Sequence, residues 1–329
     1  MFVRLLLVLI LASFLAPFAI AANDLTQPGD REGRIGLLNT QRAVASMKPS
    51  EGQSPKAIRP LLGISTYTGT GTGGGQQDSA PGAFDADGFS RFMQIGLNQS
   101  YDKTYEEGWT ILHNVVKRAL TDVGPLPAGV RLALESGRDA SYSKSWKDAY
   151  TILHETAKTV TGNPGEFAAG GPAGFAAYLH LARQSSYDKS YEVGWKVLEK
   201  FLENLAARGP TFYPSPELKL LLDAARAASY SKAWKAAYEV QHVSIKRAET
   251  LPTGDLKGFY YDNALDCSFE KTWQEGYEVL RTFIEKGLAS GLINSFDCAS
   301  LKATLQASYN QSWQTGYEVL RDGLKGLRL

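Results

Sequence analysis

The sequence predicts an all-α protein, in which six tandem helical repeats of about 40 residues follow a flexible N-terminal arm. Three observations predict this fold. A short pattern recurs six times, its aromatic residues are spaced as on one face of a helix, and glycine and proline gather between the copies. The copies begin at Ser100, Ser141, Ser186, Ser229, Ser268 and Ser308.

Each copy of the pattern carries three aromatic rings. In the first copy, SYDKTYEEGWTIL, they are Tyr101, Tyr105 and Trp109, at the second, sixth and tenth positions. With Leu112 they form a broad apolar stripe along a helix. Trp and Tyr exchange places between the sixth and tenth positions of different copies. Because packed cores tolerate exchanges that keep the total volume, we expect these rings to be buried between neighbouring repeats.

Each copy holds about 30 helix-compatible residues between breaks such as Gly124-Pro125 and Gly209-Pro210. These residues could form one long helix or a hairpin of two helices. We favour the hairpin, because Asp102 is a turn-forming residue and Thr104 precedes Glu107 at the capping-box spacing. Ser145 with Asp148 and Thr272 with Glu275 have the same spacing. Tandem hairpins can form an open α-solenoid or close into an α/α array.

The N-terminal residues have the pattern of an export signal. Arg4 supplies a positive charge, residues 5–16 are apolar, and Ala19 and Ala21 are small residues at the cleavage spacing. We therefore predict a signal peptide at residues 1–21, a secreted or periplasmic protein, and no integral membrane segment after cleavage. Residues 22–85 are rich in Gly, Ser, Thr and Pro and are predicted to form the flexible arm, and residues 86–329 the helical domain.

Composition excludes several classes of protein. Lys and Arg number 35 against 34 Asp and Glu, so no basic excess indicates a nucleic-acid partner. His113, His154 and His242 share one position of the pattern, but one such side chain per repeat does not converge on a metal, and we predict neither a metal nor a cofactor. Cys267 and Cys298 could form a disulfide in an oxidising compartment, although parallel first helices would hold them apart.

The candidate binding residues are the lysines at the fourth position of the pattern. Stacked repeats would align them on one edge, as a ladder for carboxylates or phosphates of a partner, or they could be solvated residues of the connections. The sixth copy has Gln311 at this position. The five lysines are Lys103, Lys144, Lys189, Lys232 and Lys271.

The Ser-x-x-Lys spacing formed by these lysines is also that of the acyl-serine motif of penicillin-binding enzymes. One active site does not need five copies of its nucleophile, and the companion S-D-N and K-T-G motifs are absent from the sequence. We therefore assign no catalytic residue.

These observations predict an exported helical-repeat scaffold that binds a partner in the cell envelope or another protein, without catalysis. The alternative is a carbohydrate-binding or carbohydrate-active protein built on a closed (α/α)6 toroid, with aromatic rings lining its cavity. A further alternative is sugar binding through exposed rings. Burial of tryptophans such as Trp234 would indicate packing between repeats, and exposure would indicate binding.

Overall fold

The computed structural model describes residues 84–252 and 254–327. The regular elements of this part of the chain are thirteen α-helices and one 3-10 helix, with no strand. The predicted signal peptide, and the predicted arm up to residue 83, lie outside the described residues. The elements are α3 (Ala86–Ser100), α4 (Tyr105–Asp122), α5 (Ala128–Ser141), α6 (Trp146–Gly162), α7 (Pro164–Ala169), α8 (Gly171–Ser186), α9 (Tyr191–Ala207), η1 (Pro210–Phe212), α10 (Pro216–Ser229), α11 (Trp234–Glu249), α12 (Leu256–Ser268), α13 (Trp273–Ser290), α14 (Ser295–Ser308) and α15 (Trp313–Gly326).

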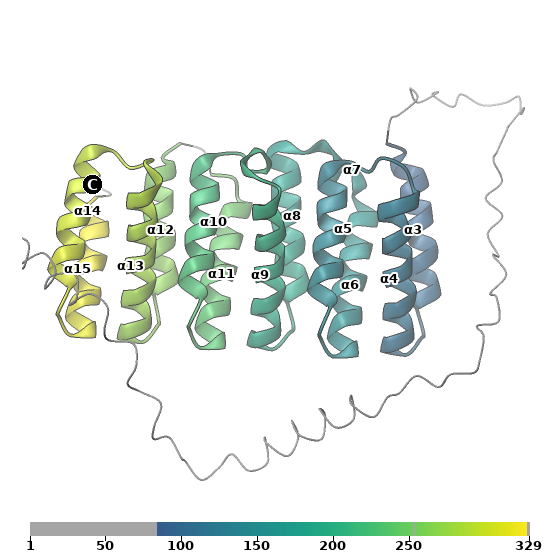
Figure 1. Cartoon of the computed structure of the whole chain (residues 1–329), viewed down its shortest axis with the longest axis horizontal. Coiled ribbons are helices and arrows are strands. Elements are labelled where there is room, and N and C mark those ends of the chain that lie inside the picture. Colours follow the sequence, from purple (N-terminus) through teal and green to yellow (C-terminus); the bar gives the residue numbers. More distant parts are fainter. Residues whose placement is uncertain (1–83, 253, 328–329) are drawn as a thin grey trace, which may run out of the picture. The chain divides into compact units, whose positions relative to one another are not determined.

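The chain breaks into two helices at every copy of the pattern, so the two-helix alternative is the one that the structure has. We number the resulting hairpins 1 to 6 in chain order. Their short turns lie along one edge of the helices, which is the lower edge in Figure 1 and which we call the turn edge. The longer connections, including α7, lie at the opposite edge. The hairpins are α3/α4, α5/α6, α8/α9, α10/α11, α12/α13 and α14/α15.

All six turns have the same backbone geometry. In the first, Tyr101 is extended, Asp102 is left-handed with a φ of 56°, and Thr104 caps α4. The Thr104 hydroxyl accepts from the Glu107 amide, while the Glu107 carboxylate accepts from the Thr104 amide, which is the capping box that the spacing predicts. This geometry ends one helix and starts the next within four residues. The left-handed residues of the turns are Asp102, Ser143, Asp188, Ser231, Glu270 and Asn310.

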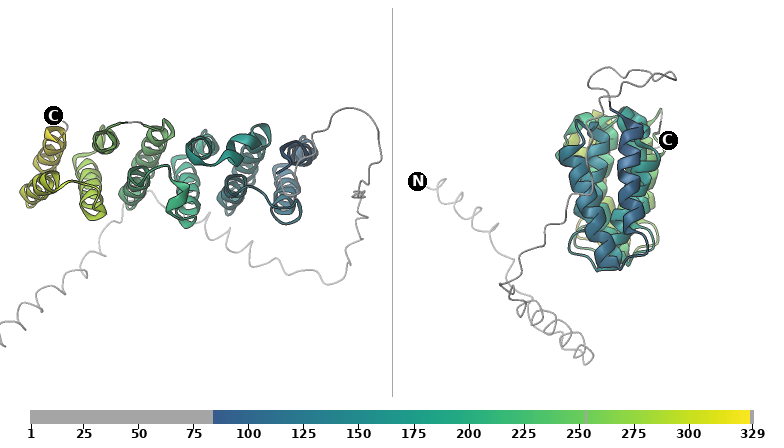
Figure 2. Two further views of the ribbon diagram at one scale, coloured as in Figure 1. Left: turned by 90° about the horizontal axis from the view of Figure 1, so that it is seen from above. Right: turned by 90° about the vertical axis from the view of Figure 1, so that its right-hand side faces the viewer.

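The twelve hairpin helices form two layers (Figures 1 and 2). One layer holds α4, α5, α9, α10, α13 and α14, and the other holds α3, α6, α8, α11, α12 and α15. Each hairpin therefore crosses from one layer to the other, and successive hairpins cross in opposite directions. Hairpins 1 and 6 stand at opposite ends of the row (Figure 1), so the helices do not close into the toroid that the alternative prediction requires.

The core lies between the two layers. Its largest fully buried side chains include Phe89, Phe201, Phe283 and Tyr261, none of which belongs to the repeated ring positions. In α4, the buried positions Leu112 and Val116 continue the predicted apolar stripe away from the turn edge. Within the described residues, no helix is both long and apolar enough to span a bilayer.

The left-handed turn residue should be a site where glycine stabilises the protein. Glu270 has a φ of 56° and an exposed side chain. A side chain in this conformation costs about 1–2 kcal/mol, which exceeds the entropy cost of a glycine of about 0.5–1 kcal/mol. We expect Glu270→Gly to raise the free energy of unfolding by about 0.5–1 kcal/mol in chemical denaturation.

Lys286→Gly is the control, since this exposed residue lies inside α13. It should lower the free energy of unfolding by about 1 kcal/mol. A loss of stability in both variants would contradict the turn geometry.

Candidate functional site

The structure shows that the predicted burial of the rings is wrong for two of the three ring positions. The six sixth-position rings are each between 44% and 49% exposed. Three second-position rings, Tyr101, Tyr187 and Phe269, are between 65% and 68% exposed. The second position directly follows the first helix and the sixth position begins the second helix, so both lie at the helix ends, where less of the neighbouring hairpin covers them. The tenth-position rings are better covered: Tyr277 and Tyr317 are buried, and the other four are half-buried.

The sixth- and tenth-position rings form three clusters at the turn edge. Each cluster joins an odd-numbered hairpin to the next even-numbered one, and the sixth-position ring of each hairpin contacts the tenth-position ring of the other. The ring centroids of these crossed pairs are 5.4 to 5.9 Å apart. The clusters are Tyr105, Trp109, Trp146 and Tyr150; Tyr191, Trp195, Trp234 and Tyr238; and Trp273, Tyr277, Trp313 and Tyr317.

The ninth position of the pattern explains the exchange of Trp and Tyr. A Cβ added to Gly108 would lie 2.7 Å from Cε2 of Tyr150, so only glycine leaves room for that ring. All four tenth-position tyrosines pack against a ninth-position glycine of the neighbouring hairpin in this way. The two tenth-position tryptophans instead face helices that carry Ala149 or Ala237. The tyrosine–glycine pairs are Tyr150/Gly108, Tyr238/Gly194, Tyr317/Gly276 and Tyr277/Gly316.

The first serine of each copy is buried in the same interfaces. Ser141 donates its hydroxyl to the Arg138 carbonyl oxygen and accepts from Nε1 of Trp109 at 3.0 Å. Ser229 accepts from Nε1 of Trp195 in the same way, at 3.1 Å. These hydroxyls are engaged in packing the hairpins together, which is a structural use of the Ser-x-x-Lys spacing.

The three aligned histidines lie against the tenth-position rings of their own helices; two of them stack, and His154 is tilted by 36°. His113 lies 4.7 Å from Trp109, His154 lies 5.4 Å from Tyr150, and His242 stacks on Tyr238. Burial lowers the pKa of each of these histidines. Nearby Arg and Lys side chains lower the pKa of His113 and His242 further, whereas Glu155 partly opposes the effect of burial at His154. Among the described residues, no group of three or more His, Cys, Asp or Glu side chains is placed to hold a metal.

The structure places all five predicted lysines at the turn edge, but it gives them different partners. Lys232 pairs with Glu278 of the next hairpin, and Lys271 pairs with Glu239 of the preceding one. Lys103, Lys144 and Lys189 have no carboxylate within ion-pair distance among the described residues. Both carboxylate partners occupy the eleventh position of the pattern in the neighbouring copy. This position holds Glu239 in the fourth copy and Glu278 in the fifth, but Thr151 in the second and Lys196 in the third. The fourth position alone therefore does not predict which lysines are paired.

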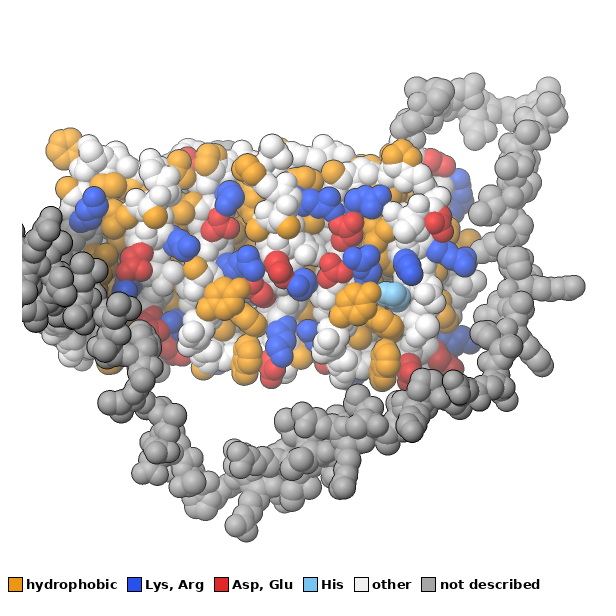
Figure 3. Space-filling model, in the orientation of Figure 1, with side chains coloured by type: hydrophobic (Ala, Val, Ile, Leu, Met, Phe, Trp, Pro, Cys, Tyr) orange, Lys and Arg blue, Asp and Glu red, His pale blue; other side chains and the backbone are white. Residues whose placement is uncertain are grey.

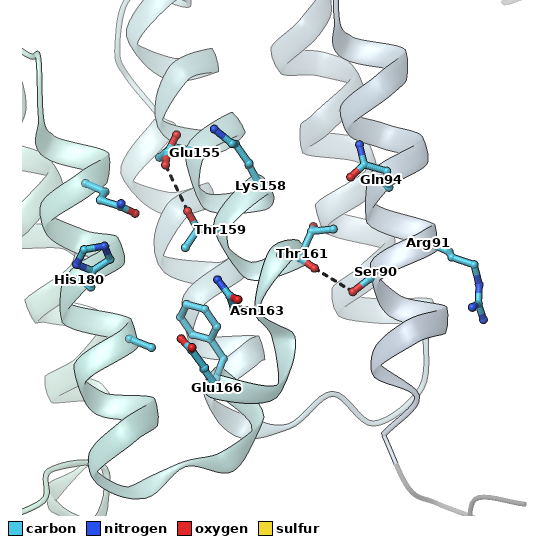
Figure 4. A pocket seen from close by; sticks show the side chains of 14 residues that line it. Ser90, Arg91, Gln94, Glu155, Lys158, Thr159, Thr161, Asn163, Glu166 and His180 are labelled. Atoms are coloured by element: carbon cyan, nitrogen blue, oxygen red, sulfur yellow. Dashed lines mark hydrogen bonds between the residues drawn. The ribbon is translucent and has the colours of Figure 1, made fainter. Parts of the chain in front are cut away.

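Away from the turn edge, a groove of about 740 Å³ lies between α3, α6 and α8 (Figure 4). Ser90 donates to the Thr161 carbonyl oxygen, and the Thr159 hydroxyl donates to Glu155. His180 lines the groove and bonds to Glu249 outside it. The side chain of Phe167 is buried, and no cluster ring opens into the groove, so it offers no exposed stacking platform.

The two cysteines carry free thiols in the structure, so the disulfide considered from the sequence is not formed. Cys267 lies in the last turn of α12, near the turn edge, whereas Cys298 lies in the first turn of α14, at the opposite edge. Burial raises the pKa of the Cys267 thiol to about 12.

No family model, no curated protein and no solved structure matches this chain.

Trp234 should contribute less to stability than a core ring. It is 44% exposed, contacts Trp195 at 5.4 Å between centroids, and lies under the Lys196 ammonium. We expect Trp234→Ala to lower the free energy of unfolding by about 1–2 kcal/mol. Phe283→Ala, at a fully buried position, should cost about 3–5 kcal/mol. Equal losses in chemical denaturation would mean that the indole belongs to the core.

The three aligned histidines should make stability depend on pH. Their pKa values are lowered in the folded state, so below the ordinary value of 6.5 the unfolded chain binds protons that the folded chain does not. The contribution to stability is full above about pH 7.5 and is lost as the pH falls through 6.5 toward the folded-state pKa values. The melting temperature should therefore drop between pH 7.5 and 5.5.

The combined variant His113→Gln, His154→Gln, His242→Gln should show a flatter dependence of melting temperature on pH over this range. An unchanged slope would show that other groups cause the dependence.

Proposed function

We propose that this protein is an exported α-solenoid of six helical repeats, and that it acts as a scaffold which binds a partner protein through the turn edge. The uniform geometry of the six turns supports the repeat interpretation. The export signal in the sequence, with Arg4 and the apolar residues 5–16, supports the location.

The observation that carries this proposal is the distribution of exposed apolar side chains. Among the described residues, fifteen large hydrophobic side chains are exposed, and eleven of them occupy the second or sixth position of the pattern. A half-exposed tryptophan leaves on the order of 100 Å² open to water. Covering it would contribute about 2–3 kcal/mol before the costs of association are subtracted. Concentration of such residues at one edge is typical of an interaction surface.

The chemistry of the turn edge favours a protein partner. Tyr and Trp are enriched at protein interfaces, where their rings pack and their polar groups form hydrogen bonds. Hydrophobic side chains lie among charged ones near the lower edge of the face in Figure 3. The pattern recurs in every hairpin, which supplies the extended surface that repeat scaffolds use.

Carbohydrate binding is the alternative, and the half-exposed sixth-position tryptophans favour it, since flat rings stack on sugars. However, each of these rings also packs against a tenth-position ring of the neighbouring hairpin. The tilt between the rings is 50° to 61°, so the clusters do not form flat platforms.

The combined variant Trp146→Ala, Trp234→Ala, Trp313→Ala tests the proposal, because it removes one exposed indole from each cluster. We expect the immobilised wild-type chain to retain a component from an extract of the source organism, and the variant to retain at least about tenfold less. The variant's circular dichroism spectrum should match that of the wild type.

Ile95→Ala, Leu292→Ala, Phe296→Ala is the matched control, since it removes exposed apolar side chains outside the repeated ring positions. This variant should retain the component normally. Treating the extract with protease should abolish retention. Loss of retention after periodate oxidation of the extract, but not after protease, would instead establish the carbohydrate alternative.

A further inference from the structure

Hairpins 2 and 3 meet in the same way as hairpins 4 and 5. In both cases the first helix of the even-numbered hairpin packs beside the second helix of the odd-numbered one: α5 beside α9, and α10 beside α13. At the junction of hairpins 4 and 5, the Lys232 ammonium is bonded to the Glu278 carboxylate, and its side chain is only 5% exposed. This junction therefore carries its own counter-ion.

At the junction of hairpins 2 and 3, Lys144 takes the place of Lys232, but Lys196 takes the place of Glu278. Lys144 is half-buried and forms no ion pair among the described residues. It lines a pocket of about 510 Å³ whose other lining residues include Tyr142 and Trp195. We call this the Lys144 pocket.

The other charged groups of the Lys144 pocket are already paired. Asp139 is paired with Arg138, Glu199 with Arg226, and Glu203 with Lys200. Lys196 is paired with Glu192, which lies one turn away on α9. The remaining charge of the pocket is the positive charge of Lys144.

We propose that the Lys144 pocket binds a carboxylate from an acidic segment of the partner protein, in the position that the Glu278 side chain fills at the equivalent junction. This inference rests on the proposed function, because it assigns a chemistry to one part of the turn edge.

The environment of Lys144 supports this assignment. Its pKa is lowered, first by burial and then by the nearby Lys196 charge. Asp148 and Glu192 only partly oppose this, so Lys144 carries its charge at a cost in free energy. An incoming carboxylate offsets this cost, since it supplies an opposite charge and a charge-assisted hydrogen bond. The rings of Tyr142 and Trp195 can pack on the methylene groups of a glutamate, which a free phosphate lacks.

Lys196→Glu tests the proposal by installing the carboxylate that the equivalent junction has. The new side chain should pair with Lys144 and close the site. We expect a fluorescent decamer of glutamate to bind the full wild-type chain in an anisotropy titration, more weakly as salt is added. Lys196→Glu should weaken binding at least about tenfold, and so should Lys144→Met, which keeps the apolar stem. Both variants should melt within a few degrees of the wild type.

Lys147→Glu is the matched control, since it makes the same change of charge at an exposed residue of α6 that does not line the Lys144 pocket. It should alter the affinity for the peptide by no more than about twofold. Equal weakening in Lys147→Glu and Lys196→Glu would mean that only overall charge matters, and would overturn the proposal. Absence of peptide binding to the wild type would overturn it as well.

Two further probes distinguish the source of the carboxylate. Inorganic phosphate should not compete with the peptide at millimolar concentration, and polygalacturonic acid should bind more weakly than the peptide. Binding of polygalacturonic acid alone would overturn the assignment to a protein segment. The two proposals fail separately, because the tryptophan variant tests partner retention without altering Lys144, and Lys144→Met tests peptide binding without altering an exposed ring.

Discussion

The crossed packing of rings between odd- and even-numbered hairpins is the contact on which the arrangement of the turn edge depends. A tenth-position tyrosine fits over a ninth-position glycine of its neighbour, as Tyr150 does over Gly108. A tenth-position tryptophan instead donates to a buried serine, as Trp109 does to Ser141. These contacts bring the second helices of two hairpins together at their first turns, and they hold the sixth-position rings at the helix ends.

Because successive hairpins cross the two layers in opposite directions, each hairpin meets its two neighbours in different ways. Second helices meet at one interface, where the ring clusters lie. A first helix meets a second helix at the next interface, where Lys232 reaches Glu278. One pattern of residues therefore serves two kinds of interface. This division also explains why the eleventh position supplies the carboxylate partners of Lys232 and Lys271.

The local features of the fold could be predicted from the sequence. Thr104 and Glu107 form the predicted capping box, and Asp102 forms the predicted turn, because both depend on neighbouring residues alone. The environment of Trp234 could not be predicted in this way. Helical periodicity gives the face on which a ring lies, but it does not say how much of the neighbouring hairpin covers that ring at the helix end. The partner of Lys232 could not be predicted either, because it lies on another hairpin and the pattern does not specify how successive hairpins are oriented.

The exchange of Trp and Tyr illustrates the difference between constant volume and burial. The sixth- and tenth-position rings of a hairpin keep a constant total volume, which predicts that both are buried. However, only the choice of Tyr or Trp at the tenth position depends on the space left by Gly108 or Ala149. The sixth-position ring is nearly half open to water in every hairpin, and it remains Tyr or Trp there. One side of each sixth-position ring packs against a tenth-position ring of the neighbouring hairpin, and the rest of the ring stays open to water. We propose that the part of this ring left open to water is the part that a partner at the turn edge covers.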